Sequence, residues 1–236
     1  MKKKILLIAA THGDEKIGIE VINNLKDKGL NKYFDCLIAN TMALDKNVRF
    51  VEVDLNRSYP GSRESLLYEE RRAYENLILA QNYRYVIDIH EASQGINNFI
   101  IVPKERLSES FPIDLIDMGT VLLWPDPKGP LGQVVENAIE LEFGMKNRNR
   151  KKVILKAENV IKNFIKYVYG QKPKERSVPK KLYYVYGKLM QSEFNGDISQ
   201  IKDFKKAEIN SEQFYPLLVG QYLKSGIICY KMKLFG

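Results

Sequence analysis

The chain has 236 residues, of which 44% are apolar and 28% are charged, so its composition is that of a globular protein rather than a disordered one. Its formal net charge is +8, but lysines and arginines are scattered among acidic residues along the whole sequence, and we therefore expect no nucleic-acid partner. The apolar run at residues 5–10 is six residues long, too short to span a bilayer, so we expect no membrane segment. Two cysteines do not make a disulfide framework, which favours a cytoplasmic location.

Hydrophobic periodicity predicts alternating strands and helices from the start of the chain. Residues 4–10 form a continuous apolar run of strand length, and apolar residues at helical spacing follow at 17–25, with Gly29 as the stop. Six further segments have the length and pattern of strands: 34–39, 48–53, 85–89, 98–102, 120–123 and 138–143. Two further segments have the periodicity of amphipathic helices: 64–80 and 153–168.

This alternation predicts an α/β fold, with a mostly parallel sheet covered by helices on both faces. The composition of the sequence changes after Gly170. Residues 171–179 are polar and bounded by prolines, which is typical of a linker. The remainder of the chain is rich in strand-forming runs and contains no long helical pattern. We therefore expect a main domain at residues 1–170 and a small β-rich C-terminal domain at residues 171–236.

The chain contains only two histidines, and each follows a predicted buried strand. His12 comes after the first strand and His90 after the strand at 85–89, so both are expected at the carboxyl edge of the sheet, where ligands bind in open α/β folds. Glu15 follows His12 at a spacing that allows both side chains to converge on one ion. Two imidazole nitrogens and one carboxylate oxygen suit Zn²⁺ and leave a position open for water. The spacing alone is also compatible with histidines that never meet in space.

Four short motifs occur in a fixed order along the chain. They are T-H-G-D-E at 11–15, D-L-N-R at 54–57, D-I-H at 88–90 and E-F-G at 142–144, with a weaker echo at 214–220. Together they resemble the succinylglutamate desuccinylase/aspartoacylase family, a branch of the zinc carboxypeptidase-like fold. The resemblance implies a mostly parallel or mixed central sheet flanked by helices. It also implies a zinc-dependent hydrolase that cleaves the amide of a small N-acyl amino acid, a substrate that bears a carboxylate.

The resemblance assigns the metal and the proton chemistry to four residues. His12, Glu15 and His90 match the family's zinc ligands, and bound zinc would lower the pKa of a water molecule to about 7. Glu142 matches the glutamate that acts as general base on this water and returns the proton to the leaving amine. Glu140 is a competitor for this role because residues 140 and 142 share a strand face, but the family pattern favours Glu142.

The same resemblance implies residues that bind the substrate. Arg49 matches an arginine that polarises the scissile carbonyl and stabilises the tetrahedral oxyanion. Asn56 and Arg57 match a pair that grips a substrate carboxylate, for which a guanidinium offers a planar two-point fork. Asp54 is expected to accept a hydrogen bond from a zinc-bound histidine. Tyr222 resembles a tyrosine that reaches the site from the C-terminal domain, although in a chain with 14 tyrosines a packing role is the alternative.

The chain departs from the family pattern where the amino-acid side chain of the substrate would bind. Members that act on N-acetylaspartate carry a further arginine before the E-x-G motif, whereas residues 121–140 contain no arginine here. The pocket is therefore open to a side chain that is not acidic. Three alternatives remain at this stage: a metallocarboxypeptidase that holds a chain-terminal carboxylate on Arg57, a non-catalytic zinc-binding protein, and a nucleic-acid-binding module. The sequence also leaves open a homo-oligomer.

Overall fold

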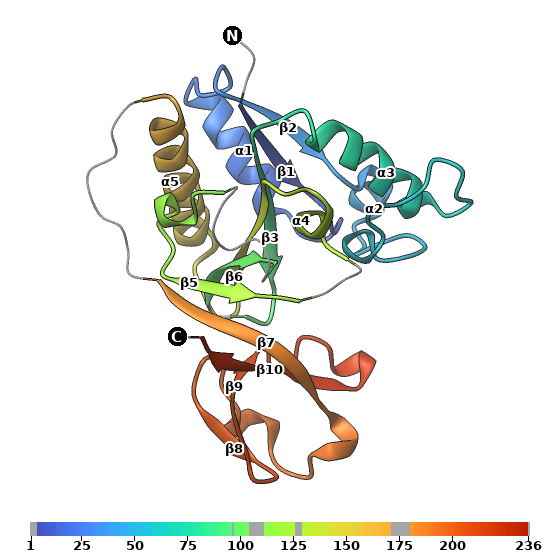
Figure 1. The fold of residues 1–236 in the computed structure, drawn as a ribbon, viewed down its shortest axis with the longest axis vertical. Coiled ribbons are helices and arrows are strands. Elements are labelled where there is room, and N and C mark those ends of the chain that lie inside the picture. Colours follow the sequence, from blue (N-terminus) through green and yellow to red (C-terminus); the bar gives the residue numbers. More distant parts are fainter. Residues whose placement is uncertain (1–3, 96, 104–110, 126–128, 171–179, 236) are drawn as a thin grey trace.

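The computed structural model of the protein describes residues 4–95, 97–103, 111–125, 129–170 and 180–235 (Figure 1). Its strands are β1 (Ile5–Ala9), β2 (Phe34–Ile38), β3 (Tyr85–Ala92), β4 (Asn98–Val102), β5 (Thr120–Leu123), β6 (Ala138–Gly144), β7 (Lys181–Met190), β8 (Ala207–Ile209), β9 (Glu212–Leu217) and β10 (Ile227–Leu234). Its α-helices are α1 (Ile17–Asp27), α2 (Thr41–Lys46), α3 (Tyr68–Ala80), α4 (Leu131–Val134) and α5 (Arg150–Val168). The expected linker at 171–179 lies outside the described residues.

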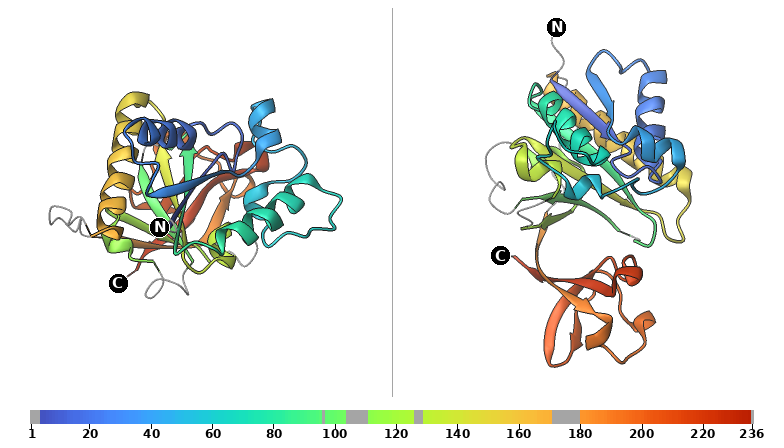
Figure 2. Two further views of the ribbon diagram at one scale, coloured as in Figure 1. Left: turned by 90° about the horizontal axis from the view of Figure 1, so that it is seen from above. Right: turned by 90° about the vertical axis from the view of Figure 1, so that its right-hand side faces the viewer.

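The strands form one mixed sheet of ten strands in the order β2-β1-β3-β6-β4-β5-β7-β10-β9-β8. Strands β2, β1, β3 and β6 run parallel to one another, and β4 is antiparallel to β6. Helices α1 and α5 cover one face of this part of the sheet, and α3 and α4 cover the other (Figure 2). The α/β fold predicted from the sequence is therefore confirmed.

The burial of β1 explains why its sequence is a continuous apolar run. All five residues of β1 are buried, because the strand lies in the sheet interior between two layers of helices. Ile5 and Leu7 belong to the core beneath α1 and α5, whereas Leu6 and Ile8 pack on the side of α3. Helix α1 buries its apolar stripe against the first of these two cores.

The C-terminal part of the chain continues the same sheet. β7 pairs in parallel with β5, and β10, β9 and β8 follow by antiparallel pairing. This β-rich part extends below the helical layers in Figure 1. The sheet thus runs from one part to the other without a break, and the division into two domains at residue 170 stays a prediction. Among the described residues, no helix is both long and apolar enough to cross a membrane.

The predicted strand at 48–53 is wrong, because this segment is a loop. Its backbone N–H groups bond to a side chain instead of a neighbouring strand. The carboxylate of Glu69, which is fully buried in α3, accepts hydrogen bonds from the N–H groups of Val51, Glu52 and Val53 at 2.6, 3.1 and 3.3 Å. The helix predicted at 64–80 is likewise shorter and begins at Tyr68, whose N–H donates to Glu52 at 2.5 Å.

Glu69 is therefore the anchor of the loop that carries Arg49, Asp54 and Arg57. We expect Glu69→Gln to lower the free energy of unfolding by about 2–3 kcal/mol, because hydrogen bonds to a buried charge are lost or weakened. Urea unfolding followed by circular dichroism measures this change. Glu75→Gln on the same helix is the matched control, since Glu75 is exposed and pairs only with Arg72 among the contacts described. Equal stability of the two variants would show that Glu69 does not anchor the loop.

Gly13 is a second constraint on the turn that follows β1. A Cβ atom at this position would lie 2.0 Å from the carbonyl carbon of Ala43 and 2.3 Å from the backbone nitrogen of Leu44, so the turn and helix α2 can approach only because residue 13 is glycine.

We expect Gly13→Ala to destabilise the protein by about 1–3 kcal/mol, the usual cost of forcing extra volume into a packed region. Gly187→Ala is the control, because the atom nearest to its Cβ would be Cε of the flexible Lys231 side chain at 3.2 Å. Thermal unfolding of both variants measures the difference. A Gly13→Ala protein as stable as wild type would contradict the close packing of this turn.

Candidate active site

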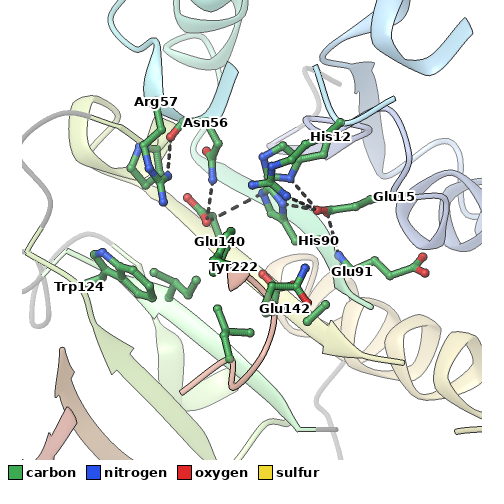
Figure 3. A pocket seen from close by; sticks show the side chains of 16 residues that line it. His12, Glu15, Asn56, Arg57, His90, Glu91, Trp124, Glu140, Glu142 and Tyr222 are labelled. Carbon is green, nitrogen blue, oxygen red and sulfur yellow. Dashed lines mark hydrogen bonds and ion pairs between the residues drawn. The ribbon is translucent and has the colours of Figure 1, made fainter. Parts of the chain in front are cut away.

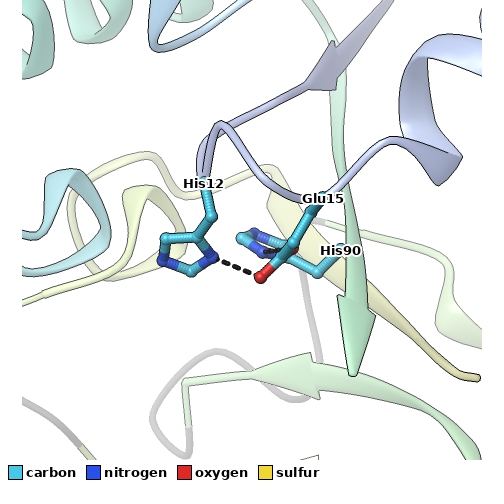
Figure 4. A group of neighbouring side chains, drawn as sticks. All are labelled: His12, Glu15 and His90. Carbon is cyan, nitrogen blue, oxygen red and sulfur yellow. Dashed lines mark hydrogen bonds and ion pairs between the residues drawn. The ribbon is translucent and has the colours of Figure 1, made fainter. Parts of the chain in front are cut away.

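The topology brings the two histidines together. β1 and β3 are adjacent parallel strands, with Ala9 opposite Ile89, so the residues that follow their carboxyl ends share one edge of the sheet. His12 and Glu15 lie in the turn between β1 and α1, and His90 lies in β3 next to them (Figure 4). One potential ligand atom from each of the three residues lies within 4.8 Å of the others. The convergence expected from the sequence is therefore present.

The orientation of each ring fits a metal centre. Nδ1 of His12 lies 2.6 Å from Oε1 of Glu15, and Nδ1 of His90 lies 3.1 Å from Oε2 of the same carboxylate. The opposite nitrogens face other carboxylates: Nε2 of His12 lies 3.1 Å from Asp54, and Nε2 of His90 lies 3.1 Å from Asp88. The hydrogen bond to Asp54 fixes the ring of His12, and the ion-pair contact with Asp88 lies on the same far side of His90, so both Nδ1 atoms are left for a metal. This donor set of two nitrogens and one carboxylate oxygen fits Zn²⁺.

Mutual electrostatic attraction keeps this cluster charged. Burial opposes the charged form of His12, but the carboxylates of Glu15 and Asp54 outweigh it and raise the pKa of His12 to about 8. Burial likewise opposes ionisation of Glu15, yet the two histidines hold its pKa well below the usual range. The pKa of His90 is also raised, by Asp88 and Glu15 against the effect of burial. A divalent metal ion bound to the two Nδ1 atoms would displace the protons of His12 and His90. Its positive charge would then neutralise the carboxylate of Glu15 in their place.

Arg49 lies beside the predicted ligands. Its guanidinium donates to Oδ2 of Asp54 at 3.1 and 3.2 Å, and its Nη1 lies 3.6 Å from Oε1 of Glu15. The ring of Tyr222 faces the same guanidinium at 5.9 Å. Arg49 is thus a fixed cation at the edge of the metal cluster, the position from which a guanidinium can stabilise a developing oxyanion.

Glu142 is opposite His90 in the pairing of β3 and β6, so its carboxylate lies across the cleft floor from the predicted ligands (Figure 3). Burial, together with the negative charge of Glu15, raises the pKa of Glu142 to about 8. A carboxylate with a raised pKa can both take up and release a proton near neutral pH. This electrostatic environment suits the general base expected at this position.

One cleft is lined by the eight residues to which the resemblance assigns a metal-binding, catalytic or substrate-binding role. They are His12, Glu15, Arg49, Asn56, Arg57, His90, Glu142 and Tyr222. Tyr222 also packs edge-to-face against Tyr230 at 5.8 Å, so it lines the cleft and contributes to the C-terminal core as well. The geometry brings these residues together, and their individual roles stay predictions.

Other residues of the cleft were missed or set aside by sequence reasoning. Trp124 and Leu218 form part of its apolar wall, and no short motif marks them. Glu91 contributes through its backbone, whose N–H donates to Oε2 of Glu15 at 2.9 Å, while its side chain pairs with Arg150. Glu140, considered only as a competitor of Glu142, lines the cleft beside Asn56.

Comparison with curated proteins finds partial matches to proteins named as aspartoacylases and as an N-acyl amino acid amidohydrolase. A probable aspartoacylase from Prochlorococcus marinus subsp. pastoris is 26% identical over 121 residues, which cover 45% of this chain and 39% of that protein. An N-acyl-aromatic-L-amino acid amidohydrolase (carboxylate-forming) from Xenopus laevis is 30% identical over 119 residues, which cover 43% of this chain and 38% of that protein. The chain thus matches about two fifths of the length of these curated relatives.

Comparison with solved structures and with family profiles extends the match. The succinylglutamate desuccinylase from Chromobacterium violaceum superposes with a TM-score of 0.75 at 19% identity, and the match covers 99% of this chain and 85% of that one, which shows that the two share a fold. The profile described as the succinylglutamate desuccinylase/aspartoacylase catalytic domain matches residues 1–168. The resemblance drawn from the four motifs is confirmed: the chain belongs to the succinylglutamate desuccinylase/aspartoacylase family.

Proposed function

We propose that this protein is a zinc-dependent deacylase that hydrolyses the amide bond of a small N-acyl amino acid. The observation that carries the proposal is the single cleft in which His12, Glu15 and His90 face Glu142 and Arg49. Family membership supports the reaction class, because the named relatives include aspartoacylases and an N-acyl amino acid amidohydrolase.

In the proposed reaction, His12, Glu15 and His90 hold the zinc ion. Zinc there would supply Lewis acidity, which lowers the pKa of a coordinated water to about 7 and polarises the substrate carbonyl. The carboxylate of Glu142 takes a proton from the attacking water as the new carbon–oxygen bond forms. Glu142 then donates this proton to the amine nitrogen as the carbon–nitrogen bond breaks, so that a carboxylate and a free amine leave.

Arg49 and Arg57 have separate tasks in this proposal. Arg49 is held by Asp54 next to the ligands and stabilises the oxyanion that forms from the amide carbonyl. Arg57 lies on the other side of the cleft and binds the substrate carboxylate, which fixes the amide over the metal ligands (Figure 3). The C-terminal residues Leu218 and Tyr222 add to the lining of the cleft beside these groups.

The test of the proposal is a screen of N-acyl amino acids and short peptides with the zinc-loaded protein, in which release of a free amine is measured. Hydrolysis of one or more N-acyl amino acids, with loss of activity in Arg57→Ala, is the expected result. Hydrolysis of peptides alone would replace the proposal by a metallocarboxypeptidase. A protein that binds zinc and ligands but turns over none of them would be a non-catalytic zinc-binding protein.

We expect Glu142→Gln to keep its zinc and to lose at least about 100-fold in kcat, the usual contribution of general acid–base catalysis. Elemental analysis measures the zinc, and amine release measures the turnover. The control is Glu136→Gln, which removes an exposed carboxylate two residues before β6. Turnover close to wild type in Glu142→Gln would remove this residue as the base.

Zinc binding should depend on pH, since the metal needs unprotonated imidazoles. The pKa of His12 in the metal-free protein is raised to about 8, so this histidine is protonated below that pH and must lose its proton when zinc binds. Apparent zinc affinity should therefore fall by about tenfold or more for each pH unit below 8. Glu15 stays ionised throughout this range because its pKa is lowered. Equilibrium dialysis at pH 6, 7 and 8 checks the slope, and a flat profile would contradict it.

A further inference from the structure

Glu140 is a buried carboxylate in the cleft that the proposed reaction does not use. It shares a face of β6 with Glu142, because alternate residues of a strand point the same way, and it is 5% exposed. In Figure 3 it lies between Asn56 and Arg57 on one side and His90 on the other. Glu140 is therefore part of the region where the amino-acid portion of a substrate would bind if its carboxylate lies on Arg57.

The hydrogen-bonding groups around Glu140 indicate which kind of ligand group this region can bind. The side-chain amide of Asn56 donates from Nδ2 to Oε2 of Glu140 at 3.4 Å, which holds this carboxylate in place. The other atom of the same amide, Oδ1, is buried and has no hydrogen-bond partner among the described residues. Because Oδ1 has almost no exposed surface, Glu140 is the acceptor of this pair that a ligand in the cleft can reach. A carboxylate accepts hydrogen bonds and favours a ligand group that donates them.

The charges of the side chains that line the cleft support the same conclusion. Arg49 and Arg57 are the only arginines that line it among the described residues, and Arg49 is held by Asp54 at the metal cluster. The positive charge of Arg57 is attracted by Glu140. One substrate carboxylate can still be accommodated on the guanidinium of Arg57, which is exposed, but a second one would meet the like charge of the buried Glu140. An acidic side chain is therefore disfavoured.

A cationic side chain, by contrast, can pair with Glu140 while the substrate carboxylate pairs with Arg57. An ammonium group donates up to three hydrogen bonds, which the carboxylate of Glu140 can accept. Trp124 and Tyr222 belong to the same cleft and offer aromatic faces, which attract cations.

We propose that Glu140, held by Asn56, forms a subsite for a cationic side chain, so that the preferred substrate is an Nα-acyl derivative of a basic amino acid. This inference rests on the proposed function for the placement of the α-carboxylate on Arg57. It makes Glu140 a specificity-determining residue that selects an ammonium group and rejects a second carboxylate.

Calorimetric binding to the zinc-loaded protein tests the proposal without relying on turnover. The ligands are Nα-acetylornithine, its uncharged analogue Nα-acetylnorvaline, and Nα-acetylglutamate. With the Glu142→Gln background to prevent hydrolysis, we expect acetylornithine to bind at least about tenfold more tightly than acetylnorvaline, and acetylglutamate to bind most weakly. Glu140→Gln on the same background should abolish the preference for acetylornithine and strengthen the binding of acetylglutamate. Glu136→Gln is the control that should retain the ranking.

The ranking in the protein with Glu140 intact decides the proposal even if Glu140→Gln does not fold. Acetylglutamate as the tightest ligand, or no measurable binding of acetylornithine at millimolar concentration, would overturn it. So would an unchanged ranking in a folded, zinc-loaded Glu140→Gln protein. Failure of the proposed function is distinguishable, because it would appear as absence of amine release from every N-acyl amino acid, whereas the binding preference is measured independently.

Discussion

The arrangement of the cleft depends on one carboxylate that two histidines share. Among the described residues, only Glu15 contacts Nδ1 of both His12 and His90, and it does so because β1 and β3 are neighbouring parallel strands. The opposite nitrogen of each imidazole lies near its own carboxylate, Asp54 or Asp88. Three carboxylates around two rings, of which Glu15 and Asp88 are buried and Asp54 is half-buried, would repel one another without positive charge between them. The protein thus assembles a place where a cation, whether protons or a metal, is electrostatically required.

A second layer of structure holds the residues that surround this centre. The loop after α2 supplies Arg49 and Asp54, and the short 3₁₀ turn at Leu55–Arg57 that follows supplies Asn56 and Arg57. This segment belongs to no strand. Its backbone is held by the carboxylate of Glu69 in α3, and Asp54 caps the turn through the N–H of Asn56 at 2.9 Å. An irregular loop can place four functional side chains only if its own polar groups are bonded elsewhere. In this protein, Glu69 of helix α3 accepts the hydrogen bonds of the loop backbone.

The sequence predicts those parts of the fold and the site that local pattern encodes. β1 is read correctly because a strand buried on both faces needs a continuous apolar run, and its position fixes His12 and Glu15 at the sheet edge. The convergence of His90 with them is predicted by the resemblance of the four motifs to the family, because spacing alone also allows histidines that never meet.

The loop at 48–53 could not be predicted in the same way. Its alternating apolar residues resemble a strand, and only the distant carboxylate of Glu69 takes the hydrogen bonds that a strand would need. Trp124 and Leu218 could not be predicted as cleft residues either, because distant parts of the chain bring them there. They are neighbours of the ligands only through the pairing of distant strands, and pairing leaves no local signature.

In the proposed reaction, catalysis and the choice of substrate depend on two carboxylates of one strand. Glu142 is placed by its register opposite His90, and Glu140 by its register opposite Asp88, so the two carboxylates share a face. Glu140 accepts a hydrogen bond from Asn56, is attracted by the charge of Arg57 and lies 3.9 Å from Nε2 of His90. If Glu142 is the base and Glu140 the selector, a change at residue 140 alters the charge seen by the substrate side chain and leaves the backbone position of Glu142 unchanged. On this proposal, the reaction and the specificity of a family member can diverge at alternate residues of the same β-strand.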